Sequence, residues 1–219
     1  MATSRAAYRR SAMDIREWFL IGLENNWLSL QSIPQDMRTE DMYGSALERG
    51  LISLADVPFA YRTRKLCMAG VEHQGWELSD VPLGMRDREM CLMAVKADGM
   101  ALAWVPETLC DHEICLEAVK NNGLALREVP LRCKNDEICA TALKGNGEAL
   151  EWLLEDRRTP EFCRMAVESN GMALAFVPEA LKTEELCTIA VQRDSSALRF
   201  VPWELREKMR ALVRGENSR

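Results

Sequence analysis

Histidine is nearly absent from this sequence, and no arrangement of its two histidines supports chemistry. His73 and His112 lie far apart in the chain, so no HExxH element, Cys-His pair or histidine-rich metal set can be assembled. The glycine-rich turn Gly145-Asn146-Gly147 does not follow a strand pattern, so we expect no phosphate-binding loop. We therefore expect a non-enzymatic protein with no catalytic residue, no metal ion and no cofactor.

Long hydrophobic runs are also missing. No apolar stretch approaches the roughly 18 residues needed to span a bilayer, and no segment alternates apolar and polar residues as a strand would. The first residues lack the apolar core of a secretory signal, although Arg5, Arg9 and Arg10 weakly resemble an organellar presequence. We favour a helical capping extension there, no membrane association and a cytoplasmic location.

The balance of charge excludes one class of partner. The chain carries −6 overall, but its ends carry +2 (residues 1–15) and +3 (residues 208–219), which leaves −11 for the part between them. Proteins that bind nucleic acid neutralise phosphates with a basic surface. Direct nucleic-acid binding is therefore not expected.

The sequence does contain a strict repeat of 24 residues. Four residue types recur on one register, which is typical of a solenoid. They are Cys67, Cys91, Cys115, Cys139, Cys163 and Cys187; Gly75, Gly99, Gly123, Gly147 and Gly171; Pro34, Pro58, Pro82, Pro106, Pro130, Pro178 and Pro202; and Leu30, Leu54, Leu78, Leu102, Leu126, Leu150, Leu174 and Leu198. We predict an all-α protein, a single α-solenoid of about eight two-helix repeats (an α-helix and a short α or 3-10 helix) with capping ends.

Repeats start at residues 16, 40, 64, 88, 112, 136, 160 and 184, so the array covers 16–207 between an N-terminal extension (1–15) and a basic C-terminal tail (208–219). The residue before each of seven starts is a preferred helix N-cap. These caps are Thr39, Thr63, Asp87, Asp111, Asn135, Thr159 and Thr183. Positions 3, 4, 7 and 8, such as Ile114, Cys115, Ala118 and Val119, form one apolar helix face.

The repeating glycines and cysteines are expected to have structural roles. The helix is expected to end at Asn-Gly or Asp-Gly, as in Asn122-Gly123, with the glycine in a left-handed conformation. The repeating cysteines sit one helix spacing apart, about 8–10 Å, whereas a disulfide needs Cα atoms within about 7 Å. We expect them to be buried and reduced, and no bridge is expected between the irregular Cys110 and Cys133.

The core A-V-x-x-N-G-x-A-L-x-x-V-P, seen at Ala118-Val119 through Val129-Pro130, resembles a bacterial and large-virus tandem-repeat family catalogued as a domain of unknown function. The resemblance covers about residues 40–207. The repeat length is also similar, more distantly, to leucine-rich-repeat variants that alternate α and 3-10 helices. Neither resemblance implies a catalytic residue. Leu154 in place of Pro, and Trp27 and Leu51 in place of Gly, depart from the pattern.

Candidate recognition residues are sought where the repeat itself sets no requirement. Position 17 is polar or acidic in the front half and mostly aromatic in the rear half: Ser32, Asp56, Asp80, Trp104, Glu128, Trp152, Phe176 and Phe200. Trp104, Trp152, Phe176 and Phe200 would form a partner-binding stripe if exposed, or would enlarge the core if buried. Trp76 and Trp203 are expected to be packing residues.

A basic row precedes the caps and has two interpretations: it grips an acidic partner, or it pairs with the acidic residues at the helix starts. Its members are Arg38, Arg62, Arg86, Lys134, Arg158, Lys182 and Arg206, with Cys110 as the exception. The whole pattern favours a protein-binding repeat scaffold, for which a bacterial effector or phage-type interaction protein is a family analogy. The alternative is an acidic mimic of nucleic acid that inhibits a DNA- or RNA-binding protein.

Overall fold

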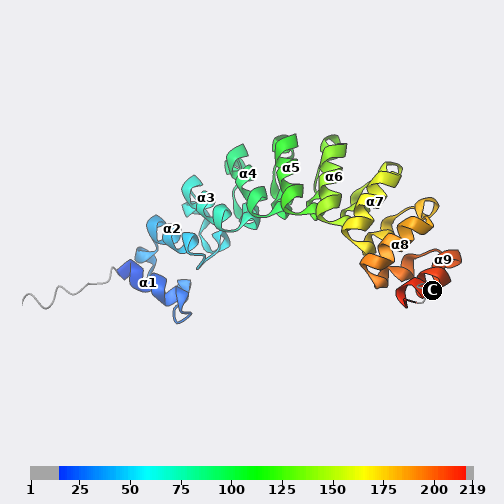
Figure 1. The fold of residues 1–219 in the computed structure, drawn as a ribbon. Coiled ribbons are helices and arrows are strands. Elements are labelled where there is room, and N and C mark those ends of the chain that lie inside the picture. Colours follow the sequence, from blue (N-terminus) through cyan, green and yellow to red (C-terminus); the bar gives the residue numbers. More distant parts are fainter. Residues whose placement is uncertain (1–14, 216–219) are drawn as a thin grey trace, which may run out of the picture.

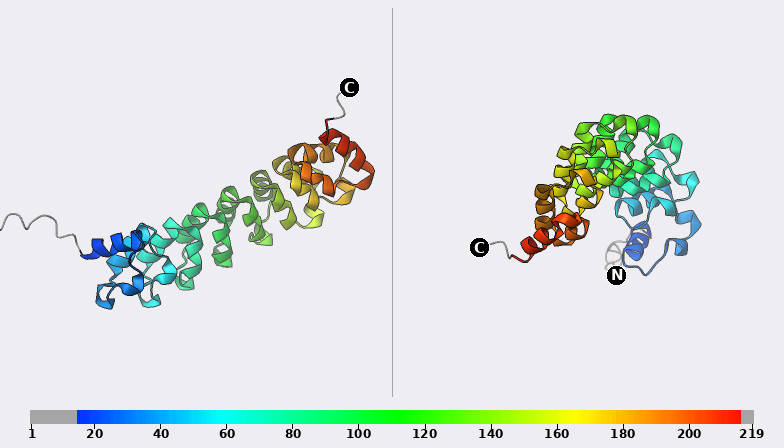
Figure 2. Two further views of the ribbon diagram at one scale, coloured as in Figure 1. Left: turned by 90° about the horizontal axis from the view of Figure 1, so that it is seen from below. Right: turned by 90° about the vertical axis from the view of Figure 1, so that its right-hand side faces the viewer.

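The computed structural model describes residues 15–215 of the chain, which form a single arched row of helices (Figure 1). Helices α1 and α9 stand at opposite ends of the row, and a second view shows the row drawn out along its length (Figure 2). These residues contain no strand, which confirms the predicted all-α solenoid. The proposed N-terminal extension falls outside the described residues except for Ile15, as does the chain beyond Gly215.

In the first seven repeats, each unit is an α-helix followed by two short 3-10 helices, one before the position of the Val-Pro pair and one after it. In the eighth repeat, α9 takes the place of the second 3-10 helix. The α-helices are α1 (Ile15–Glu24), α2 (Glu40–Glu48), α3 (Arg64–His73), α4 (Arg88–Ala97), α5 (His112–Asn121), α6 (Asp136–Gly145), α7 (Pro160–Ser169), α8 (Glu184–Arg193) and α9 (Trp203–Val213). The first 3-10 helices are η2 (Leu30–Ser32), η4 (Leu54–Asp56), η6 (Gly75–Asp80), η8 (Gly99–Trp104), η10 (Gly123–Arg127), η12 (Gly147–Trp152), η14 (Gly171–Phe176) and η16 (Ser195–Phe200). The second ones are η3 (Gln35–Met37), η5 (Phe59–Tyr61), η7 (Leu83–Met85), η9 (Glu107–Leu109), η11 (Leu131–Cys133), η13 (Glu155–Arg157) and η15 (Glu179–Leu181).

The α-helices begin where the caps predict. Each of the seven cap side chains accepts a hydrogen bond from the backbone N–H three residues later, as Asp111 does from Ile114 at 2.9 Å. This satisfies one of the N–H groups that a helix start leaves without a partner. The Asn or Asp at position 11 then caps the first 3-10 helix, as Asn122 does by accepting from the N–H of Leu124 at 3.0 Å.

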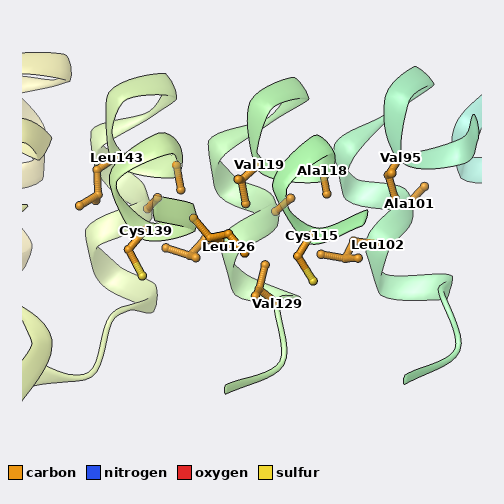
Figure 3. Close-up of a cluster of buried hydrophobic side chains, with 14 of the residues drawn as sticks. Val95, Ala101, Leu102, Cys115, Ala118, Val119, Leu126, Val129, Cys139 and Leu143 are labelled. Carbon is orange, nitrogen blue, oxygen red and sulfur yellow. The ribbon is translucent and has the colours of Figure 1, made fainter. Parts of the chain in front are cut away.

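The core is a continuous apolar seam that neighbouring repeats share. Figure 3 shows Cys115, Ala118 and Leu126 between the helices of neighbouring repeats, and all three are fully buried. One cluster of buried side chains extends from Tyr43 to Met209. Burying a leucine stabilises a fold by about 1.5–3 kcal/mol, and here a single repeat would leave much of that surface exposed. Stacking is therefore the source of stability.

The eight cysteines are all free, and seven of them are buried. Burial raises the pKa of the Cys115 thiol to about 12, so this side chain stays a neutral, apolar group. The cysteine ladder therefore belongs to the core, as the spacing predicts.

The glycine at position 12 is required for a different reason from the one predicted. In the third to seventh repeats this glycine does not have a positive φ angle, and the residue before it is extended, with φ −144° at Asn122. A Cβ atom on Gly99 would lie 2.3 Å from the carbonyl oxygen of Ala118 in the next repeat, and one on Gly147 would lie 2.0 Å from that of Ala166. The prediction of a left-handed helix cap was wrong because close contact between backbones selects glycine here.

Left-handed caps do occur in the first two repeats, where Trp27 and Leu51 replace that glycine. Asn26 has φ 57° and Gly50 has φ 65°, one residue before each replacement. Without the position-12 glycine, these repeats end their helices with the usual left-handed residue. The front end also has its own small cluster, in which Phe19 is buried.

Candidate protein-interaction surface

The position-17 residues end the first 3-10 helices, and the structure places them in two environments. Trp104 is exposed, with 46% of its surface accessible, whereas Trp152, Phe176 and Phe200 are half-buried and pack against the core. The latter three lie on the consecutive repeats of η12, η14 and η16, and Glu128 separates them from Trp104. Trp104 therefore lies in solvent, as a partner-binding residue would, whereas Trp152, Phe176 and Phe200 enlarge the core.

Guanidinium groups stack on two of the half-buried rings. Arg127 lies 5.6 Å from the ring centre of Trp152, and Arg199 lies 4.5 Å from that of Phe200. A cation over an aromatic face stabilises both partners by about 0.5–1 kcal/mol at exposed sites. Trp152 and Phe200 therefore each have a cationic partner within their own chain.

The most exposed large apolar side chains occupy position 20, which the sequence analysis did not single out. Phe59, Leu83, Leu131 and Trp203 are between 69% and 77% exposed. At Phe59, Leu83 and Leu131, position 20 follows the proline and opens a three-residue 3-10 helix that buries none of its own residues. Trp203 also follows a proline, but it opens α9. The sequence carries a signal for this position, because it holds either a large apolar residue or a polar one, unlike the uniformly apolar core positions: Gln35, Phe59, Leu83, Glu107, Leu131, Glu155, Glu179 and Trp203.

Two of the tryptophans were interpreted wrongly. Trp203 is 77% exposed and Trp76 is 44% exposed, so neither is a packing residue. Trp203 falls on position 20 of the last repeat, and Trp76 donates through its indole N–H to Gln74. We call the surface built from positions 17 to 22 of all repeats the Val-Pro edge.

The Val-Pro edge is hollowed between repeats. A depression of about 180 Å³ is lined by Leu131 and Leu154 together with the aliphatic part of Lys134 and the buried Leu153. Leu154, which replaces the repeating proline, is 57% exposed. The depression is mainly apolar and lies between two exposed leucines, so it can accept an apolar side chain.

The basic row just before the caps binds backbone carbonyl groups. In the third repeat, Arg86 donates through Nε to Val81 O at 2.9 Å and through Nη2 to Ser79 O at 3.0 Å. Its Nη1 donates to Trp104 O of the following repeat at 2.7 Å. Arg62 and Arg158 make the same three contacts in their own repeats.

The predicted pairing with the acidic residues at the helix starts is therefore wrong for the arginines of this row. These carbonyl groups lie at the ends of 3-10 helices, where the backbone has no hydrogen-bond donor left to satisfy them. The planar guanidinium group with its several N–H donors matches three carbonyl groups at once. Arg62, Arg86 and Arg158 are thus internal clamps, each of which joins its own repeat to the next.

Comparison with known families identifies the repeat. A family model described as a domain of unknown function (DUF4116) matches residues 87–132, 111–157 and 159–206 in tandem, which together are more than half of the chain. The chain belongs to the DUF4116 family. No curated protein and no solved structure matches it.

In this DUF4116 chain, the acidic residues at the helix starts pair with the first helical position of the preceding repeat. Arg64 contacts Asp87 at 2.8 Å and Glu89 at 2.7 Å, and Arg88 contacts Asp111 at 2.9 Å. His112 occupies the same position and contacts Glu137 at 3.2 Å. These pairs are exposed, so each is worth about 0–1 kcal/mol.

One DUF4116 repeat departs from the pattern by burying a carboxyl group. Glu77 stands where the following repeats have alanine, is only 1% exposed, and accepts a hydrogen bond from the N–H of Leu54 at 3.1 Å. Its pKa is raised to about 7, mainly by burial and to a smaller extent by the charges of Asp80 and Asp56, while the hydrogen bond from the Leu54 N–H opposes the shift. Gly70 replaces the usual alanine at position 7 because a Cβ there would lie 2.4 Å from Glu77 Oε2.

Two further observations concern metal binding and membrane crossing in residues 15–215, the part of this DUF4116 protein that the structure describes. Within that range, no group of three or more His, Cys, Asp or Glu side chains could hold a metal ion. None of its helices has the length and apolar character that a bilayer crossing requires.

Proposed function

We propose that this DUF4116 chain is a non-enzymatic scaffold that binds another protein along its Val-Pro edge. The observation that carries the proposal is the exposure of Phe59, Leu83, Leu131 and Trp203, each about 70% accessible, on one position of the repeat. Exposed Trp104 lies three positions before that row. Large apolar and aromatic side chains on a surface are the residues that most often anchor a protein partner.

The other regular positions of the repeat already serve its own stability. Caps, core residues, close-contact glycines and clamping arginines all have partners within the stack, such as Asp111 with Ile114 and Arg86 with Trp104. In the described residues, the position-20 side chains Phe59, Leu83, Leu131 and Trp203 are the large apolar groups that the stack leaves most exposed to solvent. Repeat proteins generally use such variable positions on an extended surface to bind partners.

The alternative, an acidic mimic of nucleic acid, has weaker support. Acidic residues at the helix starts, such as Asp87 and Asp111, form ion pairs with Arg64 and Arg88, so cations accompany these carboxylates and they do not form an unbroken acidic row like the phosphates of a nucleic acid. A role as a cytoplasmic protein of the effector or phage-encoded type belongs to the same proposal, by analogy with other repeat scaffolds.

A matched pair of variants tests the proposal. We expect the double substitution Leu83→Ser and Leu131→Ser to abolish retention of the partner on immobilised protein, because both anchors face solvent. The substitutions Glu155→Ser and Glu179→Ser at the same repeat position should leave retention unchanged. Since all four residues are exposed, the free energy of unfolding measured with urea should change by less than about 0.5 kcal/mol in either variant.

Salt separates the two candidate functions. Retention through apolar anchors should persist from low to high ionic strength, whereas a mimic should lose its partner steeply as salt screens its charge. Equal retention by wild type and the Leu83→Ser, Leu131→Ser variant, combined with a steep dependence on salt, would contradict the scaffold and favour the mimic.

A further inference from the structure

The fourth repeat lacks the arginine clamp, because Cys110 stands at that position. Its Sγ lies 3.8 Å from Val105 O, so the thiol retains one of the three contacts that an arginine makes. Beside it is a hollow of about 260 Å³, lined among others by Ala103, Val105, Cys110 and Glu128. The hollow lies between the fourth and fifth repeats, on the Val-Pro edge.

The repeat itself shows what fits this hollow. Arg62 donates to the carbonyl groups of Val57, Ala55 and Asp80. Arg86 donates to those of Val81, Ser79 and Trp104. Arg158 donates to those of Leu153, Glu151 and Phe176.

All three sets map by the 24-residue register onto Val105, Ala103 and Glu128, and each of these residues lines the hollow. In the described part of the chain, no hydrogen bond from the protein reaches the carbonyl oxygens of Ala103 and Glu128. The fourth repeat thus has the acceptors of a guanidinium site without a guanidinium side chain of its own.

We propose that this hollow binds a guanidinium group, supplied by an arginine side chain of a partner polypeptide. The proposal rests on the proposed scaffold function, and it adds the chemical group of the partner that one site recognises. Lys134, at the same position in the fifth repeat, reaches only the carbonyl group of Trp152, at 3.1 Å. A planar group with several donors satisfies the set better than an ammonium group, so the site selects arginine over lysine.

The charges around the hollow set the strength of binding. Glu128 pairs with Arg127 at 2.6 Å, and Glu107 pairs with Arg132 at 2.6 Å, so both carboxylates at the rim already have a cation. Backbone carbonyl groups are therefore the main acceptors. We expect millimolar affinity for a small guanidinium ion, and tighter binding when a polypeptide also contacts the apolar anchors.

The test is a titration of the full chain with ethylguanidinium, followed by amide chemical shifts in ¹H–¹⁵N spectra. Saturable shifts are expected at Ala103, Trp104 and Glu128, and tetramethylammonium, which has no N–H donor, should not produce them. Cys110→Arg should abolish these shifts and raise Tm, because its own side chain fills the hollow. Cys110→Ala should retain them. These measurements need no partner, so they can fail independently of the scaffold proposal.

Two short peptides identify the source of the cation. A glycine peptide with one central arginine should shift the same amides, and its citrulline counterpart should not. Binding of ethylguanidinium but not of the arginine peptide would overturn the assignment to a polypeptide side chain. The site itself is overturned by shifts that persist in Cys110→Arg, by shifts spread evenly over all repeats, by no shifts at all, or by a Cys110→Arg protein that fails to fold.

Discussion

We expect Gly147→Ala to lower the free energy of unfolding by about 3 kcal/mol or more. This is a large effect for the addition of a single methyl group. The added Cβ would lie 2.0 Å from the carbonyl oxygen of Ala166 and 2.9 Å from its carbonyl carbon. Both atoms belong to the backbone of α7, so neither can rotate away as a flexible side chain could. Relief requires the sixth and seventh repeats to move apart, which opens the shared core.

The control lies two residues earlier in the same chain. A Cβ on Gly145, the last residue of α6, meets no atom closer than 3.8 Å. Since alanine favours helix more than glycine does, Gly145→Ala should leave stability unchanged or raise it by about 0.5 kcal/mol. Urea unfolding followed by circular dichroism measures both variants. Equal stability of the two variants would show that the position-12 glycines do not set the distance between repeats.

Glu77→Gln makes the protein more stable at pH 8 and removes most of the dependence of stability on pH between about 4.5 and 8. The pKa of Glu77 is about 7 in the folded chain, against 4.5 as its ordinary value. The folded state therefore holds the proton more tightly, and stability falls as pH rises through this range. A pKa difference of this size lowers the free energy of unfolding by about 3 kcal/mol once the pH is above both pKa values.

The amide of glutamine keeps an oxygen that can accept from the N–H of Leu54, so the variant removes the charge and retains the hydrogen bond. Asp56 and Asp80 also raise the pKa of Glu77 and are present in both proteins, which is why the difference between wild type and variant is the quantity to follow. Exposed Glu155→Gln serves as the control. Parallel curves of unfolding free energy against pH for wild type and Glu77→Gln would contradict the account.

The features that sequence predicted well are local ones. Caps such as Asp111 and Asn135 act within a few residues, and the apolar spacing of Ile114, Cys115 and Ala118 depends only on the helix period. Helix starts and core positions could therefore be read from one repeat alone. The strict period then implied stacking.

The features that sequence did not predict arise between repeats. The role of Gly123 depends on the backbone of the next repeat, and the role of Arg86 depends on a carbonyl group 18 residues further along the chain. The exposure of Leu83 and Leu131 follows from 3-10 helices that bury none of their own residues. Buried Glu77 breaks the apolar pattern and is compensated by Gly70. Contacts in three dimensions decide each of these features, so the spacing of residues along the sequence could not predict them.

The central claim is that eight short repeats stack in one open row in which each repeat packs mainly on its neighbours. Small-angle X-ray scattering of the dilute protein tests it most directly. A compact globule of this length would have a radius of gyration of about 17 Å. Repeats placed in an arched row at the usual helix spacing of about 8–10 Å predict a value of about 20 Å or more and an asymmetric distance distribution. A symmetric distribution with a radius near that of the globule would contradict the stacked row.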